Sequence, residues 1–123
     1  MNDDVYMEAL NDFLSGKSGA LVLLEKLAAE GYGKAMLILA LAYDPSNEVQ
    51  YPVRKSLSTA NNYYKNAFNT LKEQAEADDP DSMFELSNCY SCGWGTEIDL
   101  FLANAWKVKS CMHGHKTACN ELN

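Results

Sequence analysis

Apolar residues recur at intervals of three and four along most of this chain, and that spacing restricts it to helices. The clearest runs cover 21–28, 35–43 and 60–71, and each would place its apolar side chains on one helical face. No stretch alternates apolar and polar residues around an Asn-Gly or Asp-Gly turn, so β-hairpins are not predicted. No apolar run approaches the roughly 18 residues that a membrane span needs. The chain is therefore predicted to be all-α, with no membrane contact.

Capping residues and glycines mark the expected ends of these helices. The predicted N-terminal caps are Asp3 or Asp4, Ser18, Ser56, Asp79 followed by Pro80, and Asp99. The glycines expected just after helix ends, where they take a positive φ, are Gly16, Gly31 and Gly114. The predicted helices cover 4–15, 18–30, 33–43, 56–77, 80–90, 99–113 and 115–122.

Two segments repeat one helix-pair scheme. Segment 82–114 carries, in order, Ser82, Leu86, Ser87, Tyr90, Gly93, Gly95, Asp99, Ala103, Trp106, Lys109, Ser110, Cys111 and Gly114. Segment 31–68 carries Gly31, Ala35, Leu39, Ala40, Tyr43, Ala60, Tyr63, Tyr64, Ala67 and Phe68. Small residues let two helices approach closely while large aromatic residues fill the space between pairs. The loop 44–55 is longer than its counterpart and lacks paired glycines, and we expect Tyr51 or Val53 to pack under helix 56–77.

This order of residues resembles the Sel-one-like repeat, a relative of the tetratricopeptide repeat, over about 100 of the 123 residues. The resemblance implies an all-α, right-handed α/α repeat array of about seven helices in a single domain over 1–123. Within it we expect a repeat half at about 17–31, repeats at about 31–77 and 78–114, and a terminal helix at 115–123. Members of the family act as adaptors that hold other proteins, so the resemblance implies a protein–protein interaction module.

Four cysteines, Cys89, Cys92, Cys111 and Cys119, leave three interpretations open. A C-x-x-C pair followed by a Cys/His cluster is one spacing of zinc sites. In the repeat register Cys111 and Cys119 take packing positions, which favours free structural thiols in a reducing cytosol. The resemblance implies a third interpretation, because cysteine-rich members bridge such a pair, which makes Cys111 and Cys119 the disulfide candidates. A redox dithiol at Cys89 and Cys92 is disfavoured because a helix precedes the motif.

Residues for enzymatic chemistry are not arranged in any known pattern. The two histidines, His113 and His115, lie at one turn, where imidazoles can cover terminal carbonyls. Gly93-Trp94-Gly95 has no Lys-Ser or Lys-Thr after it, as a phosphate-binding loop would. We therefore predict neither catalysis nor a metal or other cofactor.

Charge is the most individual feature of the sequence. Acidic residues number 17 against 10 Lys and Arg, and the net charge of -7 argues against unaided binding of nucleic acid or anionic lipid. Residues 73–99 contain eight acidic residues and no Lys or Arg. Folding needs only a few of them as caps, so a basic protein partner is expected. The predicted partner-binding residues are Glu76, Asp78, Asp79, Asp81, Glu85, Trp94 and Glu97, with Trp94 as an exposed loop anchor.

These features favour an immunity- or antitoxin-like protein of bacteria that binds and neutralises a basic effector toxin such as a nuclease. The alternatives are a general scaffold or signalling adaptor and a zinc-binding or redox protein. Acidic residues at the amino terminus, where a secretory signal is positively charged, predict a cytoplasmic location.

Overall fold

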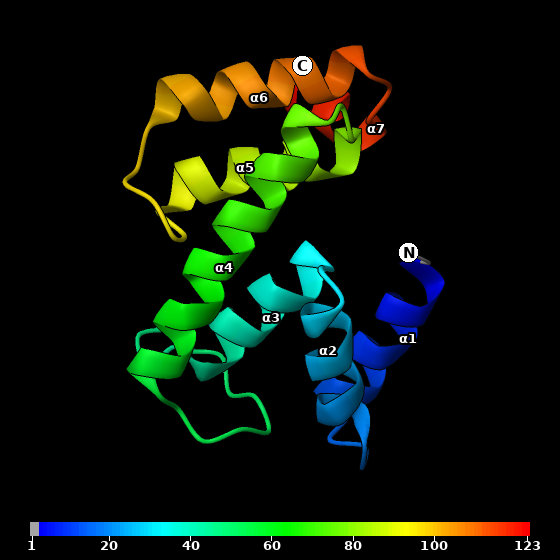
Figure 1. Cartoon of the computed structure of the whole chain (residues 1–123), viewed down its shortest axis with the longest axis vertical. Coiled ribbons are helices and arrows are strands. Elements are labelled where there is room, and N and C mark those ends of the chain that lie inside the picture. Colours follow the sequence, from blue (N-terminus) through cyan, green and yellow to red (C-terminus); the bar gives the residue numbers. More distant parts are fainter. Residues whose placement is uncertain (1–2) are drawn as a thin grey trace. The chain divides into compact units, whose positions relative to one another are not determined.

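The computed structural model describes residues 3–123, and in that range it contains seven α-helices and no strand (Figure 1). They are α1 (Asp3–Leu14), α2 (Ala20–Ala29), α3 (Gly33–Tyr43), α4 (Leu57–Glu76), α5 (Pro80–Cys92), α6 (Leu100–Met112) and α7 (Lys116–Leu122). Every predicted helix limit lies within two residues of the observed one. The all-α fold predicted from the apolar spacing is therefore confirmed.

The chain forms two compact units that meet within α4, between Tyr64 and Lys65. In the first unit α1 packs on α2 and α2 packs on α3. Its largest fully buried side chains are Phe13, Leu24 and Leu39. The small residues Ala35 and Ala40 of α3 have no exposed surface, as the repeat scheme predicts.

The loop 44–56 closes the first unit through polar contacts. Asp44 accepts hydrogen bonds from Ser46 Oγ at 2.7 Å and from Tyr64 Oη at 2.8 Å. Lys55 Nζ donates to the carbonyl oxygens of Ala42 and Val49. Tyr51 stacks on Phe13 of α1, with 6.1 Å between ring centroids. Tyr51 was expected under helix 56–77, and the ring contact observed is with α1, where Tyr51 helps to cover Phe13, a side chain only 1% exposed.

In the second unit α5 packs on α6 and α6 packs on α7 (Figure 1). Leu71, Met83 and Leu86 are buried, and Phe68 meets Tyr90 edge to face. Two buried hydroxyls tie the helices together: Ser87 Oγ donates to the Ala103 carbonyl and Ser110 Oγ to the Pro80 carbonyl, both at 2.7 Å. Such bonds satisfy polar groups that would otherwise be costly to bury.

The caps follow the sequence at three helices and depart from it at two. Ser56, Asp79 and Asp99 each accept a hydrogen bond from the backbone three residues later. Ser18 is not the cap of α2, because the chain enters this helix through Gly19 at φ 87 without a side-chain cap. Asp3 and Asp4 lie inside the first turn of α1, where their charges favour the helix dipole.

Candidate protein-binding site

Five helix ends share one backbone geometry, and one of them lacks the glycine that this geometry favours. Gly16, Gly31, Gly93 and Gly114 follow α1, α2, α5 and α6 with φ between 75 and 94°. The same place after α4 holds Asp78, with φ of 68°. Its backbone N–H bonds to the Ala75 carbonyl at 3.0 Å, and the next N–H bonds to the Gln74 carbonyl at 3.1 Å. This is the Schellman pattern, in which a β-carbon is unfavourable.

The acidic turn, defined as Glu76, Asp78, Asp79 and Asp81, joins α4 to α5. Glu76 and Asp78 are exposed, and the Asp78 side chain keeps 70% of its accessible surface. Asp79 is the N-cap of α5 and bonds both the backbone N–H and the hydroxyl of Ser82. Asp81 is partly buried and is bonded to His115. Two of the four carboxylates therefore serve the fold, and two point to solvent.

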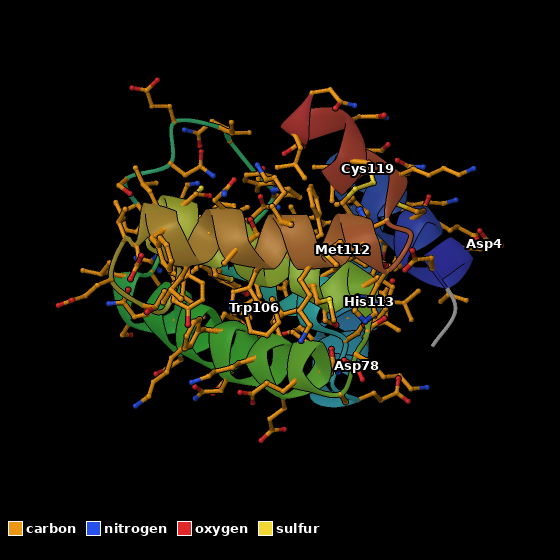
Figure 2. The ribbon with its side chains drawn as sticks, turned by 90° about the horizontal axis from the view of Figure 1, so that it is seen from above. Asp4, Asp78, Trp106, Met112, His113 and Cys119 are labelled. Carbon is orange, nitrogen blue, oxygen red and sulfur yellow. A yellow bond between two sulfur atoms is a disulfide. The ribbon has the colours of Figure 1, made fainter. Side chains whose placement is uncertain are left out.

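Both histidines lie beside this turn, within the same unit. Figure 2 shows His113 near Asp78. His115 Nδ1 accepts from the Ala118 N–H at 3.1 Å and so caps α7, which leaves Nε2 to donate to Asp81 Oδ1 at 2.9 Å. Its ring stacks on Phe84, with centroids 4.6 Å apart. His113 Nδ1 donates to the Lys109 carbonyl at 3.0 Å, and its Nε2 lies 3.9 Å from Asp78 Oδ1.

The remaining predicted residues are spread along α5 and past its far end. Glu85 lies midway along the helix, is partly buried and accepts a hydrogen bond from Asn88. Trp94 and Glu97 follow the helix, so its 13 residues separate them from the acidic turn by about 20 Å. Trp94 is half-buried, so it is less exposed than the predicted loop anchor. The structure thus brings together only the four residues of the acidic turn, with Glu85 partway along α5 and Trp94 and Glu97 past its far end.

The cysteines fall into one bonded pair and two free thiols. Cys111 of α6 and Cys119 of α7 form a disulfide with their Cα atoms 4.7 Å apart (Figure 2). Bonded sulfurs cannot serve as thiolate ligands, so the alternative of a zinc site built from four cysteines is not assembled. Residues 3–123 hold no cluster of three or more metal-ligating side chains suited to an ion. Burial raises the pKa of the Cys89 thiol to about 12, which is opposite to what a redox dithiol requires.

Sequence reasoning missed the two histidine–carboxylate pairs and the backbone of Asp78. The pairs join residues about 34 positions apart, and no local pattern foretells such a contact. The backbone of Asp78 did have a signal, because aligning the helix ends places it where Gly16, Gly31 and Gly114 stand. That comparison identifies Asp78 as an acidic residue whose backbone conformation favours glycine.

Comparisons with known proteins give likenesses of structure only. No family model matches the chain, and no curated protein matches it. A Sel1 repeat protein from Oxalobacter formigenes is 23% identical with a TM-score of 0.47, covering 80% of this chain and 36% of that one. A protective antigen present in uropathogenic Escherichia coli strains, described as displaying an SLR fold, is 21% identical with a TM-score of 0.43, covering 88% of this chain and 30% of its own.

The chain therefore spans about a third of the length of these two solved structures. The first of them is named for the repeat kind, here called Sel-one-like, that the sequence resembles. Across the described residues no helix is both long and apolar enough to pass through a bilayer.

Proposed function

We propose that this chain is a non-enzymatic protein–protein interaction module that captures a basic partner protein through the acidic turn. The favoured role is that of an immunity- or antitoxin-like protein of the Sel-one-like kind, which neutralises a basic effector toxin. The cytoplasmic location stays a prediction, and the Cys111–Cys119 disulfide argues against it, because such bonds are rare in a reducing compartment. The support comes from the chemistry of the turn and from the charge of the segment around it.

Asp78 is the observation that carries the proposal. A non-glycine residue in the left-handed region costs about 1 kcal/mol, and four other helix ends of the described residues avoid that cost with glycine, at Gly16, Gly31, Gly93 and Gly114. Contact with His113 is a weak compensation, because the two groups are 3.9 Å apart and both are substantially exposed. A residue in an unfavourable backbone conformation whose carboxylate points to solvent is better explained by a role in binding than by a role in folding.

The surroundings of Asp78 strengthen its field. Glu76 is exposed on the last turn of α4, and no Lys or Arg occurs between 73 and 99. Several carboxylates acting together accelerate the encounter with a basic surface more than one charge at a rim can. A nuclease-like toxin, whose own substrate is anionic, presents a basic surface of that kind. Binding of the acidic turn to that basic surface would compete with the toxin's anionic substrate.

The test measures association with the protein encoded beside this chain in its genome, at two ionic strengths. Asp78→Gly with Glu76→Lys should slow association by about ten-fold at ~0.1 M salt. Asp78→Gly alone should also raise the free energy of unfolding by up to about 1 kcal/mol. A role confined to folding cannot produce both effects, because glycine improves the turn while it removes the charge.

The matched control is Glu8→Lys with Glu48→Gly, which changes the net charge equally at two exposed acidic residues of the first unit. It should change the association rate by less than about two-fold at the same salt. Equal slowing by both pairs would assign the effect to net charge and would contradict the acidic turn as the site. A neighbouring protein that binds but is not toxic would favour the scaffold or adaptor role.

A further inference from the structure

The outer face of α6 carries an apolar stripe, defined as Phe101, Ala105, Val108 and Met112. All four side chains are exposed, and Phe101 and Met112 keep 81% and 78% of their accessible surface. The stripe lies opposite Ala103 and Ser110, which are buried against the rest of the unit. Figure 2 shows α6 toward the viewer, with Met112 near its end.

Folding of the repeat does not require apolar residues at these places. The repeat scheme specifies Ala103, Trp106, Lys109, Ser110 and Cys111 on this helix, and none of the four stripe residues is among them. The paired helix α5 shows what the fold alone needs, since it has no exposed large apolar side chain anywhere in 80–92. The apolar stripe is therefore an addition that the unit leaves uncovered.

The spacing of the stripe is that of a two-helix seam. Its members follow one another at intervals of four, three and four, which is the pattern that keeps apolar side chains facing a second helix. We propose that the stripe is the contact between two copies of this chain, with the two α6 helices packed antiparallel about a two-fold axis. This inference is independent of the proposed capture of a basic partner.

A second copy fits the stripe in both size and order. Antiparallel pairing centred between Trp106 and Lys107 brings Phe101 opposite Met112 of the other copy, and Ala105 opposite Val108. The first layer joins a thioether to an aromatic ring, which is a favourable contact. The contact of Ala105 with Val108 sets a small side chain against a larger one, so that the side chains at the centre of the interface are not overcrowded.

The charges beside the stripe also favour a second copy over an acidic helix of another protein. Helix α6 has no acidic residue, and both of its lysines are occupied within the unit. Lys107 Nζ lies 3.0 Å from Glu121 Oε1, and Lys109 Nζ lies 5.2 Å from the centre of the Trp106 ring. Few positive charges are thus left to attract an acidic partner, and few to repel an identical helix.

The size of the stripe sets the strength of the contact. From Phe101 to Met112 the helix rises about 17 Å, which is too short to bury the roughly 800 Å² per partner of a standard interface. Dimerisation should therefore be weak, and the dimer fraction should rise with protein concentration. Two copies each of charge -7 repel one another, so added salt should strengthen the dimer. Capture of a basic partner would respond to salt in the opposite direction.

Sedimentation equilibrium of the purified chain tests the proposal, from about 10 µM to about 500 µM. The parent chain should show a monomer–dimer equilibrium, and Phe101→Glu should weaken it by at least about ten-fold. Met112→Lys should do the same. Combining Phe101→Glu with Met112→Lys should restore association, because the antiparallel register sets the new carboxylate of each copy opposite the new ammonium of the other.

The control is Val22→Glu, which adds the same charge at an apolar position of α2 that is 68% exposed, and it should leave the equilibrium unchanged. Far-UV circular dichroism checks that each variant keeps its helices. A parent chain that stays monomeric at the highest concentration would overturn the proposal and leave the stripe to a different partner. Failure of the double variant to regain association, while both single variants lose it, would overturn the antiparallel arrangement.

Discussion

At the scale of single residues, two cysteines of one motif have opposite chemistry. Cys89 is buried in α5, where loss of solvation raises the pKa of its thiol to about 12. Cys92 is the last residue of the same helix and is exposed. Because the thiolate is the nucleophile, only the exposed cysteine should react readily near neutral pH.

Thiol labelling at about pH 8 should therefore modify one cysteine per chain rapidly, and the second only when denaturant is added. Cys92→Ser should abolish the rapid phase and leave the slow one, whereas Cys89→Ser should do the reverse. Two rapid equivalents in the folded parent protein would show that Cys89 is accessible and would reopen the redox interpretation of the motif.

The residues that sequence reasoning placed correctly are those whose role depends on near neighbours. Asp79 followed by Pro80 identifies a helix start because cap and first turn lie within four positions. Trp94 shows the limit, since it is half-buried and its degree of burial depends on tertiary packing that no local pattern contains. Ser18 shows another, because Gly19 takes a positive φ that moves the helix entrance by one residue.

At the scale of helices, the disulfide holds the shortest helix in place. Helix α7 has seven residues, and a helix of that length is not stable alone in water. Its links to the unit include the Cys111–Cys119 bond, the His115 contacts and the burial of Ala118. The covalent link removes the entropy of closing this small loop from the unfolded chain.

Reduction should lower the free energy of unfolding by about 2 to 3 kcal/mol, the value for a loop of this length. Cys111→Ala with Cys119→Ala should match the reduced parent to within about 2 kcal/mol, and a reductant should have no effect on that variant. Urea titrations with and without a thiol reductant measure both quantities. A parent midpoint that does not move with reductant would contradict a stabilising role for the bond.

Helices were easier to predict than the contacts of their outer faces. The intervals of three and four fix which side of α6 is buried, and Ala103 and Ser110 lie on that side. The opposite stripe has an equally clear period, but its exposure becomes visible only when the packing of α5 and α7 is known. Likewise the stacking of Tyr51 on Phe13 joins positions 38 apart through an irregular loop, beyond the reach of local patterns.

For the whole molecule, the single domain stays a prediction, and the chain groups into two compact units, residues 1–64 and 65–123. The boundary does not fall in a loop but between two residues of α4, the longest helix. If one unit unfolded alone, its half of α4 would unfold and the other half would gain a new helix end. Such an end leaves backbone N–H or C=O groups unpaired, which is unfavourable. We therefore expect the two units to unfold together.

Both tryptophans, Trp94 and Trp106, lie in the second unit, so intrinsic tryptophan fluorescence reports on that unit while far-UV circular dichroism reports on all seven helices. In a urea titration the two signals should give the same midpoint and the same slope, as cooperative two-state unfolding requires. Replacing Asn66 by proline, one residue beyond the boundary, should lower both midpoints equally, because it breaks α4 at a cost of about 3 kcal/mol. Fluorescence and circular dichroism midpoints that separate in the parent protein would instead mean that α4 can break at the boundary and that each unit carries its own stability.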